Sequence, residues 1–144
     1  MIPPLLIAIS VLLSLISNSY FPIIRLIPPP LNLAGLFVIV ISLSFMLFGY
    51  FQFLKQHTTL IYGQRPRHLI TSGIFSHTRN PLYLSLVLMD IGLAIFLGNL
   101  SAFIGPLVLI LSLNKFVIPN EEKTLDKLFG EKYGNYKKSV SRWI

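Results

Sequence analysis

Two stretches of this sequence carry most of the side chains that could do chemistry. The first runs over residues 65–83 and contains Arg79 and Tyr83, and the second runs over residues 119–136 and contains the pair Glu121-Glu122. Arginines and carboxylates bind groups of opposite charge through strong hydrogen bonds, and aromatic rings stack on other rings or on cations. If the fold brings the two stretches together, they form a site that combines cations, carboxylates and aromatic rings.

The composition indicates that a membrane surrounds the elements which hold this site. The chain has 144 residues, of which 53% are hydrophobic and 12% charged, and its mean hydropathy is +0.71. A soluble globular domain has about 25% charged residues, so this chain cannot cover a comparable water-facing surface. Its apolar content also excludes a disordered chain. Its length fits one domain over residues 1–144, and without cysteine it has no disulfide, thiolate metal site or cysteine nucleophile.

Four apolar segments are predicted to cross the membrane as helices, because about 20 apolar residues span the hydrocarbon core. Two N-terminal spans lie within residues 1–54, over 1–20 and 31–54, and the three prolines at 28–30 form a turn between them. Residues 82–118 are long enough for two short passes, with a strong turn signal at Gly98-Asn99. The predicted fold class is an all-α polytopic membrane protein with four transmembrane helices, the last two forming a hairpin.

The C-terminal segment, residues 119–144, is predicted to be an amphipathic helical cap. Its apolar residues recur at spacings of three and four, which is the helical period. A break near Gly130 or Gly134 divides it into two short helices. The cap lies against the membrane or folds over the loop at residues 55–81. The recurring apolar residues are Leu125, Leu128, Phe129, Tyr133, Tyr136 and Val140.

The charge distribution predicts which end of the bundle faces the cytoplasm. Eleven of the twelve basic residues fall from Lys55 to Arg79 or from Lys115 to Arg142, and only Arg25 lies elsewhere. Cytoplasmic loops are enriched in Lys and Arg, so the loop at 55–81 and the tail are both placed there. Basic residues beside bilayer-length apolar runs report topology or anionic lipid, which argues against a nucleic-acid partner. The hairpin then returns the chain to the face it left, which brings Arg79 close to Glu121-Glu122.

Each candidate residue also has a purely structural interpretation. Arg79 could contact lipid headgroups, Pro81 could simply begin a helix, and Tyr83 could belong to an aromatic belt at the interface. The pair Glu121-Glu122 could be the acidic first turn of the tail helix. No metal is predicted, because His57 and His68 lie far apart and without further ligands. Asp90, within the third span, could pack between helices or support Arg79.

The order and spacing of several motifs resemble the isoprenylcysteine carboxyl methyltransferase family, whose wider relatives include the membrane phospholipid methyltransferases. The resemblance covers about residues 65–144. It implies a membrane methyltransferase that uses S-adenosylmethionine (SAM) and acts on a lipophilic acceptor, such as an isoprenylcysteine-like carboxylate or a lipid amine. The motifs are Thr-Ser-Gly-Ile-Phe at 71–75, Arg-Asn-Pro-Leu-Tyr at 79–83, Glu-Glu at 121–122, Phe-Gly-Glu-Lys-Tyr-Gly-Asn-Tyr at 129–136 and Arg-Trp-Ile at 142–144.

The resemblance also assigns individual residues to the site. Arg79, Asn80 and Tyr83 are expected to act in catalysis. Asn80 stands where the family has histidine, so an imidazole is absent and only amide hydrogen bonds remain. Val117 stands where the isoprenylcysteine enzymes place an arginine toward the substrate carboxylate, which argues against a prenylcysteine substrate. The expected cofactor-binding residues are Arg67, His68, Leu69, Ile70, Phe75, Asn80, Pro81, Leu82, Tyr83 and Glu121.

The chemistry of SAM fits these residue types. Glu121 could pair with its ammonium and Arg79 with its carboxylate, while Phe75 and Tyr83 could contact its adenine or its sulfonium. Two other functions stay open from the sequence. One is an NADPH-dependent membrane reductase of related architecture, and the other is a non-catalytic lipid-binding membrane protein.

The topology can be tested directly, because the chain has no cysteine of its own. We expect single cysteines introduced at Thr58 and Ser139 to react with an impermeant thiol reagent from the same side of the membrane. Labelling from opposite sides would contradict both the four-span topology and the shared site.

Overall fold

The computed structural model describes residues 3–55, 66 and 68–144. All regular secondary-structure elements of these residues are helices. The described residues contain no strand beyond one isolated bridge between Arg25 and Asn99. Five α-helices follow each other along the chain, and short turns of 3₁₀ or π helix flank them. The helices are α1 (Pro3–Tyr20), α2 (Ala34–Lys55), α3 (Pro81–Leu97), α4 (Ile104–Ser112) and α5 (Ile118–Ser139), and the shorter turns are η1 (Leu31–Leu33), η2 (Gly73–Ser76), η3 (Leu100–Phe103) and η4 (Leu113–Val117).

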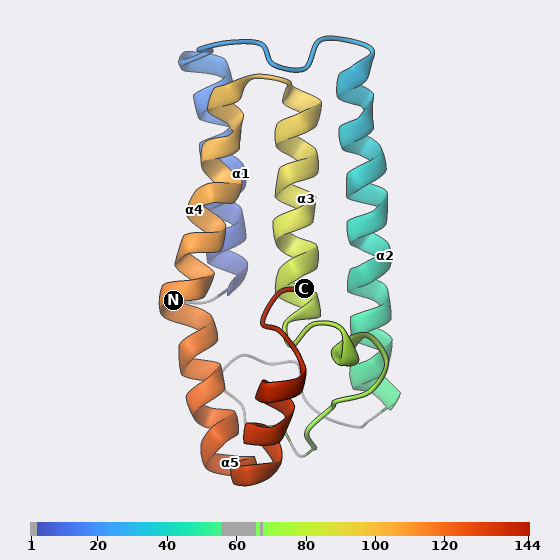
Figure 1. Ribbon diagram of the computed structural model, residues 1–144. Coiled ribbons are helices and arrows are strands. Elements are labelled where there is room, and N and C mark those ends of the chain that lie inside the picture. The colour runs from blue at the N-terminus through green and yellow to red at the C-terminus, as the bar shows by residue number, and fades with distance from the viewer. Residues whose placement is uncertain (1–2, 56–65, 67) are drawn as a thin grey trace.

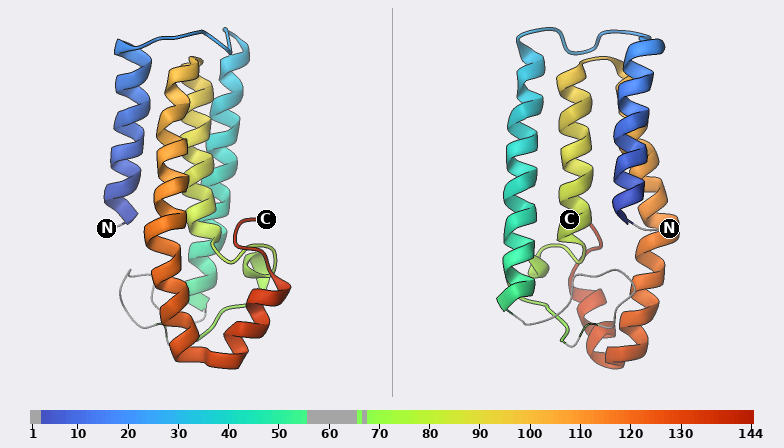
Figure 2. Two further views of the ribbon diagram at one scale, coloured as in Figure 1. Left: turned by 60° about the vertical axis from the view of Figure 1, so that its left-hand side comes forward. Right: turned by 180° about the vertical axis from the view of Figure 1, so that it is seen from behind.

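Helices α1 to α4 lie side by side as an elongated antiparallel bundle (Figures 1 and 2). The α1–α2 and α3–α4 connections share one end of this bundle. Helix α5 continues α4 through η4 beyond the other end and then turns back, so that the C-terminus lies beside the start of α3 (Figure 1). The η2 turn and the tail therefore occupy the same end, as the hairpin prediction requires.

The bundle has the lengths and the apolar faces of a membrane protein. Three helical stretches are long and apolar enough to span a bilayer, namely Pro3–Tyr20, Leu31–Lys55 and Leu100–Ser139, and the 17-residue α3 is apolar as well. Large apolar side chains such as Phe48 project outward from α2, where Phe48 is 67% exposed. Exposed apolar faces of this extent, on helices of membrane-spanning length, are typical of surfaces that contact lipid. The predicted all-α polytopic fold is confirmed.

Small residues let α3 pack closely against its neighbours. A Cβ atom on Gly35 of α2 would overlap the backbone of Gly92 and Phe96 in α3. On the opposite side, Gly105 of α4 lies directly against Ser10 and Ser14 of α1. Membrane helices associate through such close backbone approach, because lipid is as apolar as the side chains themselves. The glycines thus allow close packing of α2 on α3 and of α4 on α1.

Asp90 is part of this helix packing and does not contact Arg79. Its side chain is fully buried, and Ser14 Oγ lies 3.5 Å from Asp90 Oδ1. The same Ser14 hydroxyl donates a hydrogen bond of 2.8 Å to the Ala102 carbonyl. The contacts of Asp90 thus connect α3 to α1 within the membrane core. Of the two roles left open by the sequence, the structure favours helix packing.

Two glycines end helices as the sequence predicts. Gly98 follows α3 with φ of 82°, a left-handed conformation that glycine adopts without steric penalty, and the hairpin turns there. Within α5 the backbone leaves the helical conformation at Gly130, with φ of 50° and ψ of −124°. The predicted division of the tail into two short helices is therefore confirmed at the first of its two candidate positions. Thr58 and His57 lie outside the described residues.

Replacement of Gly35 tests the close packing of α2 on α3. We expect Gly35→Ala to lower the free energy of unfolding by about 1–3 kcal/mol, because the added methyl group overpacks the contact with the Gly92 backbone. Thermal unfolding in detergent, followed by circular dichroism, measures the change. Gly134→Ala is the matched control, since nothing lies within 4 Å of a Cβ atom there. Equal effects at both positions would contradict the packing argument.

Candidate functional site

The candidate site forms where α3 begins, between the η2 turn, the start of α5 and the C-terminal segment. Pro81 is the first residue of α3 and is buried. Proline suits this position because its ring fixes a helical φ and it needs no amide partner. Pro81 thereby fixes the position of Asn80 before the helix and of Tyr83 within its first turn. Arg79 lies just upstream, in the connection that leads from η2.

Glu122 is the electrostatic centre of the site. Its Oε1 lies 3.0 Å from Arg79 Nη1, and its Oε2 accepts a hydrogen bond of 2.8 Å from Arg142 Nη2. The side chains of Arg79 and Glu122 are only 12% and 14% exposed. The two guanidinium groups compensate the charge of this desolvated carboxylate, which would be costly to bury without a partner. Glu122 therefore joins the loop before α3 to the C-terminal segment.

The C-terminal segment is fastened to the start of α3 by three further hydrogen bonds. The Arg79 amide donates to the Ser141 carbonyl at 3.0 Å. The Thr78 hydroxyl and the Asn80 side-chain amide both donate to the Arg142 carbonyl, at 3.2 Å and 3.1 Å. Asn80 thus acts as a hydrogen-bond donor here, as its amide chemistry predicts, although its partner in this structure is the chain itself.

Two residues of the site, Asn114 and Thr78, are not indicated by any motif in the sequence. Asn114 Oδ1 accepts hydrogen bonds from Trp143 Nε1 at 3.1 Å and from Arg142 Nη1 at 3.4 Å. Asn114 lies in η4, a π-helical turn, and such turns often occur at functional sites. Thr78, which is buried, likewise becomes recognisable only through its hydrogen bond to Arg142. Neither residue belongs to a motif of its own.

Tyr83 and Glu121 form the second half of the site. The Tyr83 hydroxyl donates a hydrogen bond of 2.6 Å to Glu121 Oε1. Burial raises the pKa of the Glu121 carboxyl above its ordinary value, and the hydrogen bond from Tyr83 opposes part of that rise. The predicted meeting of residues 79–83 with the Glu121-Glu122 pair is therefore confirmed.

Arg79 has spare hydrogen-bonding capacity in this buried place. Its Nε is buried and has no hydrogen-bond partner among the described residues, and its Nη1 lies beside Glu122 without hydrogen-bond geometry. Tyr133 lies close enough to Glu122 and Arg79 for both charges to affect the pKa of its hydroxyl group. Burial and the negative charge of Glu122 raise the pKa of Tyr133 to about 12, against a smaller opposing effect of Arg79. Buried donors normally have partners, so the Arg79 Nε is a candidate to bind a ligand.

The other predicted residues lie around this centre to different degrees. Ile70 and Phe75 are buried, Leu69 is half-buried and His68 is exposed. The rings of Phe75 and Phe53 of α2 contact each other edge to face, with their centroids 5.4 Å apart. The backbone carbonyl of Phe75 accepts a hydrogen bond of 2.6 Å from the Tyr136 hydroxyl. Leu82 faces α2 at Gly49, and Val117 is fully buried in the core. Arg67 lies outside the described residues.

An apolar cavity of about 590 Å³ adjoins the site on the α2 side of α3. Phe48 and Phe51 line it from α2, Leu84 and Leu88 line it from α3, and both phenylalanines are also exposed at the outer surface. The polar residues on its wall include Gln52, Lys55, His77 and Thr78, and the last of these also binds the Arg142 carbonyl. The cavity therefore connects the lipid-facing surface with the neighbourhood of the polar centre.

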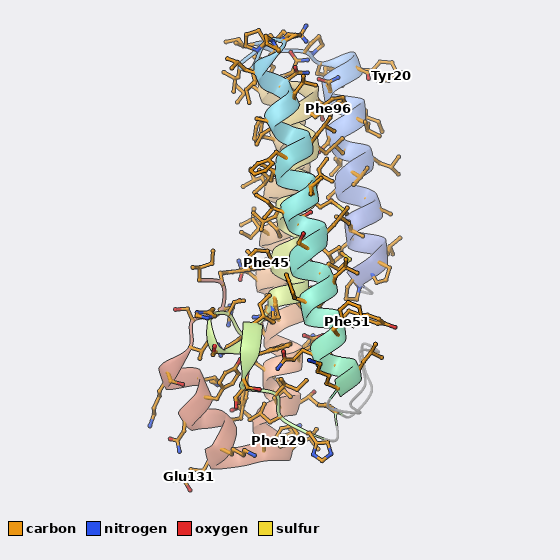
Figure 3. All side chains as sticks on the ribbon, turned by 90° about the vertical axis from the view of Figure 1, so that its right-hand side faces the viewer. Tyr20, Phe45, Phe51, Phe96, Phe129 and Glu131 are labelled. Carbon is orange, nitrogen blue, oxygen red and sulfur yellow. The ribbon has the colours of Figure 1, made fainter. Side chains whose placement is uncertain are left out.

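Within the described parts of the chain, no group of three or more histidine, aspartate and glutamate residues is arranged to hold a metal ion. Glu131 is exposed and lies beside the bend of α5 at Gly130, where it projects at the end of the molecule away from Tyr20 (Figure 3). The polar centre is thus built from arginine, carboxylate, amide and tyrosine groups.

Comparison with known proteins places this geometry in a family. The family model described as phospholipid methyltransferase matches residues 31–132. An uncharacterized protein of Haemophilus influenzae is 41% identical over 63 residues, which make up 44% of this chain and 100% of that protein. A protein-S-isoprenylcysteine O-methyltransferase of Schizosaccharomyces pombe is 31% identical over 117 residues, which make up 72% of this chain but 48% of that enzyme. This chain belongs to the phospholipid methyltransferase family of membrane methyltransferases.

Proposed function

We propose that this chain is a SAM-dependent methyltransferase that transfers a methyl group to a lipophilic acceptor at the cytoplasmic face of the membrane. The observation that carries the proposal is the buried meeting of Arg79, Tyr83 and the Glu121-Glu122 pair at the start of α3. Family membership supports the reaction class. The excess of basic residues at this end supports the cytoplasmic orientation, and the whole chain is proposed to act as one domain.

The residues at the centre fit the charged groups of SAM. Glu121 offers a carboxylate to the ammonium group of SAM. The Nε of Arg79, which has no hydrogen-bond partner among the described residues, offers a donor to the carboxylate of SAM. Tyr83 presents an aromatic ring beside them. Arg79, Asn80 and Tyr83 are the proposed catalytic residues. The proposed cofactor-binding residues are Arg67, His68, Leu69, Ile70, Phe75, Asn80, Pro81, Leu82, Tyr83 and Glu121.

The reaction needs alignment more than acid–base catalysis. SAM supplies an activated methyl group on its sulfonium, and the acceptor displaces the thioether in line. The chain contributes by orienting both reactants and excluding water, and positioning of this kind supplies up to about 7–11 kcal/mol of barrier reduction in favourable cases. An amide at position 80 in place of an imidazole is compatible with such a role, since it still donates hydrogen bonds.

The cavity beside α3 supports a lipophilic acceptor. Phe48 and Phe51 belong both to the cavity wall and to the exposed, lipid-facing surface of α2. An amphiphile can therefore pass from the bilayer into the cavity without crossing water. Position 117, where the isoprenylcysteine enzymes place arginine, is a valine in this chain and is fully buried. It therefore provides no cation. This supports an acceptor that differs from a prenylcysteine.

Replacement of Glu121 tests the proposed cofactor contact. We expect Glu121→Gln to weaken SAM binding by more than about tenfold, because a desolvated charge pair loses about 2–5 kcal/mol when one partner is neutralised. Isothermal titration of the purified protein measures the affinity. Glu131→Gln is the control, since Glu131 is exposed, and its affinity should match that of the unmodified chain. Equal affinities in both variants would mean that Glu121 only supports the helix start.

Incubation with methyl-labelled SAM and a membrane lipid extract tests the reaction itself. We expect label in a chloroform-soluble product, whose structure then identifies the acceptor. Leu88→Trp, which fills the cavity, should reduce transfer while leaving SAM affinity unchanged, and Val40→Trp on the exposed face of α2 should reduce neither. Competitive binding of NADPH in place of SAM would favour a membrane reductase. Binding of neither SAM nor NADPH would favour a non-catalytic lipid-binding protein.

A further inference from the structure

The end of the bundle opposite the polar centre is covered by an apolar cap, defined here as residues 20–33. This cap joins α1 to α2 and is mainly extended, with η1 at its end. Its large apolar side chains point outward, and Tyr20, labelled in Figure 3, projects from this end with 76% of its surface exposed. The other exposed large apolar residues of the cap are Phe21, Ile23, Ile24, Leu26, Leu31 and Leu33.

The cap has almost none of the charge that a water-facing surface carries. Arg25 is the only charged residue in residues 1–54, and residues 91–114, which include the neighbouring α3–α4 turn, have none. Polar side chains at this end bond inward. Asn99 donates to Asn18 at 2.6 Å, and Asn32 donates to the Phe96 carbonyl at 2.9 Å. The outer surface of the cap is therefore apolar, with a single cation.

The backbone of the cap is hydrogen-bonded to the α3–α4 turn. The amides of Leu26 and Ile27 both donate to the Gly98 carbonyl, at 2.8 Å and 3.0 Å, and the Leu100 amide donates to the Ile24 carbonyl at 2.9 Å. Non-helical backbone is tolerated at membrane depth only where its polar groups find partners within the protein. These bonds make the extended segment compatible with an apolar surrounding.

Two of the helices that reach this end of the bundle, α1 and α3, are slightly shorter than the hydrocarbon core of a membrane. The 17 residues of α3 rise about 25 Å, and the 18 residues of α1 rise about 27 Å, at 1.5 Å per residue. The hydrocarbon core is about 30 Å thick. Neither α1 nor α3 fills that thickness alone, whereas the 25 residues of Leu31–Lys55 exceed it. The cap, which joins the end of α1 to the start of α2, therefore lies near the edge of the hydrocarbon core. Large apolar side chains are exposed along α1 and α2 and again in the cap, and the polar residues Ser17, Asn18 and Ser19 lie between the apolar face of α1 and the cap.

We infer that the cap is a lipid-docking surface that lies at the boundary between headgroups and acyl chains in the leaflet opposite the polar centre, with Arg25 bound to a lipid phosphate. An arginine buries its aliphatic stem along apolar surface and holds its guanidinium at headgroup depth, where the guanidinium forms bidentate hydrogen bonds with phosphate. Arg25 would thereby set the depth at which the cap lies in the membrane. This inference is independent of the proposed methyl transfer, because none of its residues belongs to the polar centre.

Depth-dependent quenching tests the inference in the cysteine-free chain. A fluorescent label on Ile24→Cys, in the protein reconstituted in phosphatidylcholine–phosphatidylglycerol vesicles, should be quenched by acyl-brominated lipid and protected from aqueous iodide. A label on Glu131→Cys in the tail is the matched control and should show the reverse pattern, because Glu131 is exposed at the other end. Similar iodide quenching at both positions would overturn the inference.

The role of Arg25 is tested with the same label. Arg25→Glu should raise iodide quenching at Ile24 by about twofold or more, since its attraction to lipid phosphate becomes repulsion. Arg25→Lys, which keeps the charge, should preserve the original protection. An unchanged result in Arg25→Glu would overturn the phosphate contact. Protection from both quenchers would also overturn lipid docking, because it would mean that a second copy of the chain covers the cap.

Discussion

The ion pairs of Glu122 hold together segments of this protein that lie far apart in the sequence. One carboxylate, nearly removed from water, lies between Arg79 before α3 and Arg142 near the C-terminus. Loss of one partner from such a buried arrangement is strongly destabilising, since the remaining charge has no solvent to compensate it. The start of α3, the first turn of α5 and the C-terminal segment therefore depend on one another, and the position of Tyr83 and Glu121 follows from this constraint.

The membrane supplies the other constraint, and it acts differently on the two ends of the bundle. At one end, charged groups meet in a partly dry pocket beside an apolar cavity, an arrangement that suits a polar cofactor and a lipophilic acceptor. At the other end, polar side chains and backbone groups bond to each other, and the surface is left apolar. The central helix α3 connects these environments. Its close contacts at Gly92 and its buried Asp90 keep the short bundle together without a large hydrophobic driving force.

The C-terminal segment shows how a small chain can complete a site. The bundle provides one wall through α2 and α3, and α5 provides another after its bend at Gly130. Residues 141–144 then return between them, held by Thr78, Asn80 and Asn114. Ile144 contributes to the apolar cavity, whereas Arg142 contributes to the polar centre. One short segment thus borders both the polar centre and the apolar cavity, the two compartments that the proposed methyl transfer would use.

Most of the fold was predictable from the sequence alone, because apolar length, turn residues and charge asymmetry act locally. The apolar spans, the turn at Gly98-Asn99, the break in the tail and the approach of Arg79 to the acidic pair all follow from such local signals. The individual contacts depend on tertiary structure. Glu122 rather than Glu121 pairs with Arg79, Asp90 contacts α1 rather than Arg79, and Asn114 and Thr78 enter the site without any motif. Side-chain pairing between segments far apart in sequence is decided by helix rotation and close packing, and neither is encoded in the spacing of residues within one segment.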